Sequence, residues 1–452
     1  MRRSWVWRLS GCRGDIGMVS IAKLPKYEAY RDSGVDWLGD VPAHWNDFPL
    51  CAKSELKSIS GKEDEELLSV YLDRGVIKFD DVDAKRTNAT STDLSKYQLV
   101  EPGDFVLNNQ QAWRGSVGVS AYRGIVSPAY LILSISKDIC PKYGNYLFRD
   151  GVMVANYLVS SKGVGTIQRN LYWPQLKRAR IFLPALSEQE LIADFLDKKT
   201  TQIDEAIAIK EQQIALLKER KQIIIQKAVT QGLDPNVPLK DSGVGWIGKL
   251  PAHWEVRRSK FLFTQRKERA WKDDVQLSAT QAYGVIPQDR YEELTGYRVV
   301  KIQFHLDKRK HVEKDDFVIS MRSFQGGLER AWARGCIRSS YVVLRPLEEI
   351  DPAFYGYLLK LPAYIAALQQ TASFIRDGQD LNFDNFSKVD LFIPPVDEQR
   401  EIANYISAFM ASSDRGIDLL LAQIEKLKEY KTTLINSAVT GKIKVTPEMV
   451  EA

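Results

Sequence analysis

One phrase of fourteen residues occurs twice in this chain of 452 residues, and this repeat restricts the possible folds more than any other feature. DSGVDWLGDVPAHW occupies residues 32–45, and DSGVGWIGKLPAHW occupies residues 241–254, with ten of the fourteen positions identical. The offset between the copies is 209 residues (241 minus 32). A long phrase repeated at a domain-sized interval indicates two copies of one structural unit.

Two later blocks repeat at an offset of 210 residues. They pair IFLPALSEQELIADFLD (181–197) with LFIPPVDEQREIANYIS (391–407), and IALLKERKQIIIQKAVT (214–230) with IEKLKEYKTTLINSAVT (424–440). The stretches between the shared blocks are mostly unlike, apart from echoes such as GDFVLNNQQAWRG (103–115) and DDFVISMRSFQGG (315–327). Each half therefore has a shared opening phrase, a long divergent stretch and a shared ending.

The shared endings have the residue pattern of helices. Ser187 followed by Glu190 fits a capping box, which predicts Ser187 as the N-cap of the first helix. Leu191, Ile192, Phe195 and Leu196 then fall on one helical face. Glycine and proline predict the helix ends, at Gly232 and Pro235 in the first copy and at Gly441 and Pro447 in the second.

A seam of residues in these two helices follows alternating steps of four and three, which is the heptad spacing of a coiled coil. Its members are Ile203, Ile207, Lys210, Ile214, Leu217, Lys221, Ile224 and Ala228 in the first helix, and Ile417, Leu420, Ile424, Leu427, Lys431, Leu434 and Ala438 in the second. Ordinary amphipathic core helices are the alternative interpretation. The narrow stripes flanked by charged residues and Gln favour pairing of the two helices within one chain.

The divergent stretches have the pattern of mixed α/β domains. Short β-rich runs (DFVLN, IVSPAYLILSI, DFVISM and SSYVVLRP) are separated by clusters of Gly, Asp and Arg. Helices are expected around residues 143–160 and 354–370. The sequence thus predicts two compact α/β domains, each followed by one helix of the pair.

Composition sets broad limits on the class of protein. The net charge of +5 permits nucleic-acid binding without establishing it. The four cysteines are far apart, which argues against a zinc ribbon or a disulfide scaffold and fits a reducing cytoplasm. No apolar run approaches a membrane span. The first residues are expected to be a tail or an over-long gene start, with Met18 as a plausible alternative start.

The repeated phrase contains one near-match to a nucleotide-binding loop. Residues Gly243 to Lys249 spell G-x-x-x-x-G-K, but Leu250 replaces the Ser or Thr that would bind a metal ion, and the first copy has Asp40 in place of the lysine. We therefore expect the aromatic phrase to dock each domain against the helices. His44 and His253 recur at equivalent positions without other metal ligands at suitable spacing, so we expect a structural hydrogen-bonding role for both.

No catalytic motif is evident, and several loops have the composition of a binding surface. They are NNQQAWRG (108–115), SSKGVGTIQRN (160–170), SMRSFQGGLER (320–330) and SFIRDGQD (373–380). Arg and Lys can contact guanine edges or phosphates, Asn and Gln can pair with adenine edges, and Gly lets the backbone approach a phosphate. Any one such loop is more simply a solvated turn, but four loops at partly corresponding places favour nucleic-acid binding.

These features together resemble the DNA-specificity subunit of type I restriction-modification systems. The resemblance lies in the paired DSGVxWxGxxPAHW phrases, in FLPALSEQELIADFLD with FIPPVDEQREIANYIS, in the AVT helix ends and in GIVSPAYLIL, and it covers residues 26–445. It implies an α+β fold with an internal pseudo-two-fold repeat, in which an antiparallel coiled coil of two long helices separates two mixed α/β target-recognition domains. The implied segments are a tail (1–25), the first recognition domain (26–186), a central helical region (187–232), the second recognition domain (233–396) and a C-terminal helical region (397–445).

The resemblance also implies a function and partners. Each recognition domain would read one half of a bipartite site in double-stranded DNA, and the helices would set the spacer and dock two methyltransferase (modification) subunits. Restriction subunits that translocate and cut DNA would complete the complex. The chain itself would be non-catalytic and would hold neither cofactor nor metal, because S-adenosylmethionine, ATP and Mg²⁺ would be bound by the partner subunits, in the cytoplasm.

Residue chemistry in the four loops predicts the DNA contacts. The candidates in the first domain are Asn108, Gln110, Gln111, Trp113, Arg114, Lys162, Gln168 and Arg169, and those in the second domain are Arg322, Ser323, Gln325, Arg330, Arg376 and Gln379. Two other classes remain as alternatives. One is a scaffold that recruits proteins rather than DNA, and the other is a nuclease or methyltransferase fused to its own DNA reader.

Overall fold

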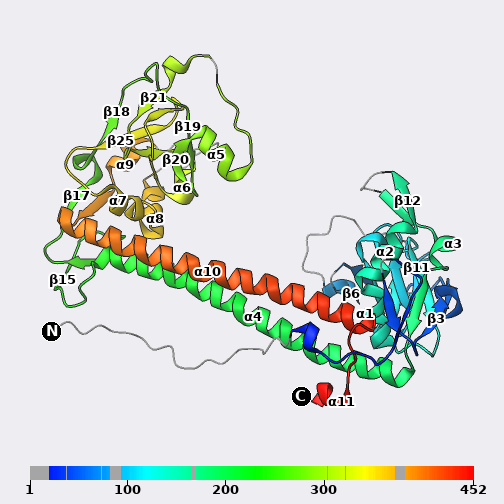
Figure 1. The fold of residues 1–452 in the computed structure, drawn as a ribbon. Helices are drawn as coiled ribbons and strands as arrows, with labels where there is room; N and C mark the ends of the chain where they lie inside the picture. The colour runs from blue at the N-terminus through cyan, green and yellow to red at the C-terminus, as the bar shows by residue number, and fades with distance from the viewer. Residues whose placement is uncertain are drawn as a thin grey trace. The chain divides into compact units, whose positions relative to one another are not determined.

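The computed structural model describes residues 20–36, 38–72, 74–81, 93–164, 168–302, 304–320, 322–371 and 382–451. The chain divides into two compact units, of which unit 1 is Met1–Glu211 with Leu421–Ala452 and unit 2 is Gln212–Leu420. Two long helices, α4 (Leu186–Gln231) and α10 (Val396–Val439), each contribute to both units. Each unit therefore contains one mixed α/β domain, the end of one long helix and the start of the other (Figure 1).

Unit 1 is built on a four-stranded antiparallel sheet. Its strand order is β4 (Ser54–Lys57), β11 (Tyr130–Ile135), β8 (Phe105–Asn108) and β9 (Val117–Val119). Five strand pairs surround it: β1 (Tyr30–Asp32) with β2 (Asp40–Pro42), β3 (Asn46–Pro49) with β14 (Arg180–Leu183), β5 (Leu68–Tyr71) with β6 (Gly75–Lys78), β7 (Gln98–Val100) with β10 (Gly124–Val126), and β12 (Ser161–Val164) with β13 (Gln168–Leu171). Its short helices are α1 (Pro141–Arg149), α2 (Gly151–Val159) and α3 (Trp173–Leu176).

Unit 2 repeats this topology, except that its described residues contain no counterpart of the β12–β13 pair. Its central sheet has the order β18 (Phe263–Arg266), β25 (Val342–Pro346), β22 (Phe317–Ile319) and β23 (Glu329–Arg330). The surrounding pairs are β15 (Leu239–Asp241) with β16 (Lys249–Pro251), β17 (Glu255–Arg258) with β26 (Asp390–Ile393), β19 (Leu277–Thr280) with β20 (Gly284–Pro287), and β21 (Lys310–Val312) with β24 (Gly335–Ile337). Its helices are α5 (Gln288–Thr295), α6 (Ser323–Gly326), α7 (Pro352–Leu358), α8 (Pro362–Gln370) and α9 (Phe383–Ser387). The two stretches that differ in sequence therefore share one strand arrangement. Each of them forms a mixed α/β domain, as predicted.

The central strand of each sheet is buried on both faces. In β8, Phe105 and Leu107 belong to one apolar cluster and Val106 belongs to another. In β22, Phe317 and Val318 divide between two clusters in the same way. Because successive side chains of a strand point to opposite faces, a run of consecutive apolar residues identifies a strand with a core on each side. This is why the echo contains the consecutive apolar residues Phe-Val-Leu (105–107) and Phe-Val-Ile (317–319).

A buried carboxylate precedes each of these strands. Asp104 Oδ2 accepts from the Glu101 N–H (2.8 Å) and lies 2.7 Å from Nζ of Lys57, which is on β4, an outer strand of the sheet. Asp316 Oδ2 accepts from the Glu313 N–H (2.8 Å) and from Arg266 Nε (2.7 Å). The Asp of each repeated Asp-Phe-Val run thus closes a turn and pairs with a cation on an outer strand.

The long helices lie antiparallel to each other within each unit. In unit 1, Lys431 Nζ lies 2.6 Å from Asp204 Oδ2, and Lys210 Nζ donates to Gln423 Oε1 at 2.7 Å, so partner numbers fall along α10 as they rise along α4. In unit 2, Lys221 Nζ lies 2.5 Å from Asp414 Oδ1. The structure buries the predicted seam residues fully or in part. The lysines in the seam keep their stems between the helices and extend their amines to acidic or amide groups at the edge.

The start of the first long helix differs from the prediction. The helix α4 already begins at Leu186, and the N–H groups of Glu188 and Gln189 donate to the carbonyl of Ala185 at 3.0 Å. The prediction of Ser187 as N-cap is therefore wrong, because Ser187 lies inside the first turn. The predicted ends are confirmed, since Gly232 and Gly441 follow the helices with φ of +74° and +73°, a conformation that favours glycine.

The shared Glu-Gln pair at each helix start explains much of the repeat. Glu188 accepts from Trp45 Nε1 (3.2 Å) and lies 3.0 Å from His44 Nε2. In unit 2, Glu398 accepts from Trp254 Nε1 (3.0 Å) and lies 2.8 Å from His253 Nε2. The repeated phrase therefore docks each domain on a helix start, and both histidines have the predicted hydrogen-bonding role.

The glutamine of each pair is buried and tied to the backbone of its own domain. Gln189 Oε1 accepts from the N–H of Cys140, the residue before α1, at 2.9 Å. Gln399 Oε1 accepts from the N–H of Asp351, the residue before α7, at 2.8 Å. Each long helix is thus fixed to the opening phrase by its Glu and to the residue before α1 or α7 by its Gln.

The near-match to a nucleotide-binding loop is a hairpin in the structure. Gly243 to Gly248 connect β15 to β16, and both glycines have positive φ. The Trp246 indole N–H donates to the Asp390 carbonyl at 3.1 Å. A phosphate loop needs a strand followed by a helix, so this segment has the expected docking role.

Candidate nucleic-acid interface

The predicted contacts of unit 1 gather around Trp113. This residue lies in η4 (Ala112–Arg114), a single turn that follows β8. Its indole N–H donates to the Gln110 carbonyl at 3.0 Å, and the Gln110 N–H donates to Asn108 Oδ1 at 3.1 Å. The Arg114 guanidinium carbon lies 4.6 Å from the Trp113 ring centre. The loop thus holds an indole and an exposed arginine in one fixed arrangement.

The β12–β13 hairpin brings more predicted residues to this loop. The Leu171 N–H donates to the Asn109 carbonyl at 3.1 Å, which joins the hairpin to the loop. The Arg169 guanidinium carbon lies 5.7 Å from the Trp113 ring centre, and Lys162 Nζ lies 3.9 Å from the Tyr172 ring centre. Two segments that are about fifty residues apart in the sequence therefore converge, as a shared binding surface requires.

This cluster suits a polyanionic and aromatic ligand. A guanidinium over an indole face is attracted by the ring and keeps its outer N–H groups available for phosphate or guanine. Arg114 and Gln110 are exposed, whereas Gln111, Trp113 and Arg169 are half-buried. The side chain of Gln168 lies outside the described residues.

The predicted contacts of unit 2 are less concentrated. Arg322 and Gln325 are exposed at α6, which occupies the position of η4 in the repeat. Ser323 is fully buried and its Oγ accepts from the Ser320 N–H at 2.9 Å, so it closes a turn and does not reach the surface. Arg376 and Gln379 lie outside the described residues.

The remaining candidate, Arg330, is held by neighbours. Its Nε and Nη2 atoms donate to Asp315 Oδ1 at 2.8 and 2.6 Å. Its guanidinium carbon lies 4.4 Å from the centre of the Trp332 ring, which is 53% exposed. Sequence reasoning missed Trp332, although the run RAWAR resembles the run QAWR around Trp113.

A cavity of about 780 Å³ adjoins these residues within unit 2. Its lining includes Trp332, Tyr283 and the carboxylate of Glu329. Glu329 is only 2% exposed, and burial raises its pKa to about 7, although Lys360 Nζ lies 2.7 Å away and opposes the shift. No sequence signal pointed to this acid, because its burial depends on the fold of α7 and β23.

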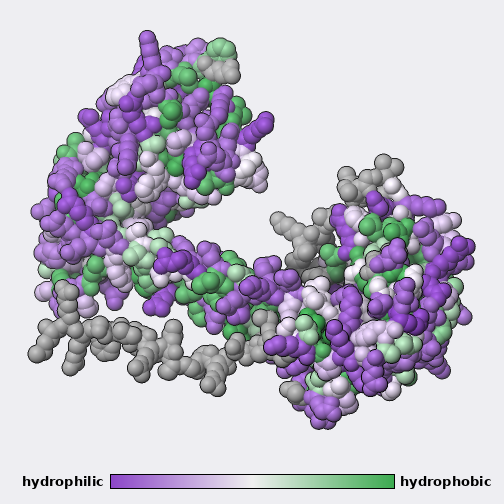
Figure 2. All heavy atoms as spheres, in the orientation of Figure 1, coloured by the Kyte–Doolittle hydropathy of each residue, from purple (hydrophilic) through white to green (hydrophobic). Residues whose placement is uncertain are grey.

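In Figure 2 hydrophilic side chains cover most of the visible surface of each unit, and apolar patches are local. Within the described ranges, no cluster of three or more His, Cys, Asp or Glu side chains has the geometry of a metal site. None of the described helices is long and apolar enough to cross a membrane.

Comparisons with known proteins agree with this fold. Residues 251–427 match the family model described as type I restriction modification DNA specificity domain. The type I restriction enzyme MjaX specificity subunit of Methanocaldococcus jannaschii is 22% identical over 453 residues, which are 95% of this chain and all of the relative. The MjaVIII specificity subunit of the same organism is 23% identical over 472 residues, which are 95% of this chain and 99% of the relative.

Two solved structures share the fold. One is a chain from a study of complex assembly and conformational transition of the type I R-M system, with a TM-score of 0.61, 14% identity, and coverage of 88% of this chain and 98% of that chain. The other is the HsdS subunit of Thermoanaerobacter tengcongensis, with a TM-score of 0.53, 15% identity, and coverage of 89% and 98%. The fold is thus that of a two-domain chain with two long helices. Residues 251–427 match a DNA specificity domain, and the chain as a whole is similar to specificity subunits of type I restriction enzymes.

Proposed function

We propose that this chain reads a bipartite DNA site, one half with each recognition domain. The observation that carries this proposal is the repeat of one fold with unlike surfaces. Unit 1 presents Trp113 with Arg114 and Arg169 close to its ring, whereas unit 2 presents Arg322 and Gln325 at the corresponding turn. A shared frame with different side chains suits the recognition of two different half-sites.

The repeat also supports docking of two copies of one partner. The two Glu-Gln helix starts have matching contacts, so two equivalent docking surfaces would lie on one chain, as they do across the interface of a homodimer. We propose that two modification subunits occupy them and methylate adenine with S-adenosylmethionine, and that restriction subunits supply ATP- and Mg²⁺-dependent translocation and cleavage. The chain itself would contribute recognition rather than catalysis, within the cytoplasm.

The test is to co-express the chain with the modification subunit of its own system and to map methylated adenines across a known genome. We expect a single motif with two defined halves and a gap of fixed length. If the complex assembles but adds no methylation, the result would favour a protein scaffold. The predicted DNA-contact residues would then be rejected. Methyl transfer by the chain alone would instead favour a fused enzyme.

A further inference from the structure

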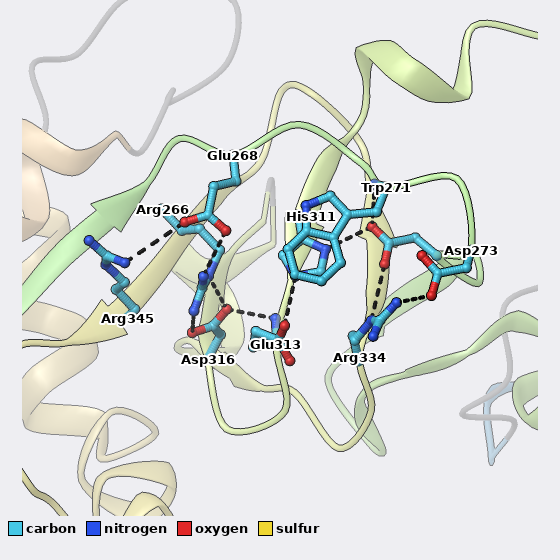
Figure 3. A network of polar contacts seen from close by, with 10 residues as sticks. Arg266, Glu268, Trp271, Asp273, His311, Glu313, Asp316, Arg334 and Arg345 are labelled. Carbon is cyan, nitrogen blue, oxygen red and sulfur yellow. Dashed lines mark hydrogen bonds and ion pairs between the residues drawn. The ribbon is translucent and has the colours of Figure 1, made fainter.

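Trp271 is exposed to solvent, yet neighbouring side chains fix the orientation of its ring. Its side chain is 48% exposed, yet its ring stacks on the His311 imidazole with centres 3.9 Å apart and planes 16° apart (Figure 3). Its backbone N–H donates to Asp274 Oδ2 at 2.8 Å. Arg334 lies over the same indole, with its guanidinium carbon 4.9 Å from the ring centre. The indole therefore has a fixed orientation although it faces solvent.

The histidine beneath Trp271 is itself locked by two carboxylates. His311 is fully buried, with Nδ1 2.7 Å from Asp274 Oδ2 and Nε2 2.9 Å from Glu313 Oε1. Two acceptors require two donors, and only the imidazolium supplies them. Burial lowers the pKa of His311, but the hydrogen bonds to Asp274 and Glu313 outweigh it and the net pKa is raised. The Trp271 ring is thus stacked on a buried imidazolium cation.

The same local arrangement occurs three times in the chain. Ala-Trp flanked by a basic residue appears as QAWR, RAWK and RAWAR, at Trp113, Trp271 and Trp332. Each of these indoles has an arginine within 5 Å of its ring centre. Trp332 lines a cavity, whereas Trp113 lies in the predicted interface of unit 1. Trp271 therefore resembles a binding element by its chemistry, outside every loop for which contacts were predicted.

Three basic residues without ion pairs flank Trp271 in the sequence. Lys267, Arg269 and Lys272 are exposed and make no ion pair with any described residue. The backbone here is extended, because the Ala270 N–H donates to the Arg309 carbonyl at 2.9 Å, so Lys267 and Arg269 project from the same side of the segment. Three exposed cations in the same short segment as a rigid indole fit a polyanion that also offers flat rings.

We propose that Trp271 with Lys267, Arg269 and Lys272 forms an additional DNA-contact surface of unit 2. The cations bind backbone phosphates, and the indole packs against a sugar or an unstacked base. This inference rests on the proposed function, since it assumes that the chain binds DNA. The buried imidazolium and Arg334 are positioning groups that prevent the indole from collapsing onto the apolar core.

The test compares variants of the full chain in complex with its modification subunit, using a duplex that carries the mapped recognition site. We expect Trp271→Ala to raise the Kd about 5-fold to 100-fold, because base–aromatic stacking contributes that much. The control is Phe261→Ala, since Phe261 is 58% exposed with Lys260 Nζ 5.0 Å from its ring, and it is expected to leave the Kd unchanged. The triple variant K267A/R269A/K272A leaves the His311 contacts intact and should lower the salt dependence by about one unit per lost phosphate contact.

The outcomes separate the inference from the proposed function. If the unaltered complex does not bind the duplex, the proposed function fails. If it binds, and Trp271→Ala and the triple variant match it in Kd and salt dependence, only the inference fails. If DNA binding is unchanged but assembly with the modification subunit weakens, the surface contacts protein and the inference is overturned. If Trp271→Ala does not fold, the Kd and the salt dependence of the triple variant test the inference instead.

Discussion

Arg114 and Arg322 occupy matching turns of the two domains, which makes them a matched pair for testing DNA contact. A base contact would cost about 1–3 kcal/mol and relax one position of one half-site on substitution by Ala. A phosphate contact would weaken all sequences alike and lower the salt dependence by about one unit. We expect each variant to affect only its own half-site, measured by duplex binding over a range of salt. An affinity that is unchanged at every salt concentration in both variants counts against both contacts.

Glu329 should make unit 2 sensitive to pH. Its ordinary pKa is 4.5 and its folded pKa is about 7, so between these values the folded state keeps a proton that the unfolded state loses. Stability therefore falls as pH rises through this range. This pKa difference lowers the free energy of unfolding by about 3 kcal/mol above pH 7, relative to its value below pH 4.5. We expect Glu329→Gln to raise the Tm at pH 8 and to change it little at pH 5, measured by calorimetry. A lower Tm at both pH values would show that the Lys360 ion pair outweighs the burial of the acid.

Buried glutamines help to attach the long helices to the domains. Gln189→Ala or Gln399→Ala would leave buried backbone groups without partners, at about 1–3 kcal/mol for each lost partner. We expect the first variant to destabilise unit 1 and the second to destabilise unit 2, seen as separate shifts in thermal unfolding. The control is Glu401→Ala, an exposed position two residues after Gln399, which should change stability by under about 0.5 kcal/mol. Equal effects of all three variants would contradict this role.

The sequence predicts the elements well where the information is local. The seam from Ile203 to Ala228 follows from heptad spacing alone, and the helix ends follow from Gly232 and Gly441. The helix start was misplaced because Ser187 satisfies the capping pattern, whereas the backbone starts the helix from Ala185. The support of Trp271 could not be predicted, since His311 lies forty residues away and only the β-strand pairing brings them together.

The whole chain is a cyclic repeat in which each unit joins the end of one long helix, a domain and the start of the other helix. Tyr30 and Gly441 show this in unit 1, where the tyrosine hydroxyl donates to the glycine carbonyl at 3.1 Å. In unit 2, Gly232 lies against Trp254 and Glu398. The two ends of the chain thus complete one unit.

If the helix pair sets the gap between half-sites, its length should change that gap alone. One heptad added to α4 beside Lys210 and one added to α10 beside Gln423 would keep the seam in phase and lengthen the pair by about 10 Å at 1.5 Å per residue. That is about three base pairs at 3.4 Å each. We expect methylation mapping to show both half-sites unchanged and a gap about three base pairs longer. Four-residue insertions at the same points, which break the seam phase, should abolish assembly. An unchanged gap in a variant that assembles and methylates would mean that the DNA, rather than the helices, determines the spacing.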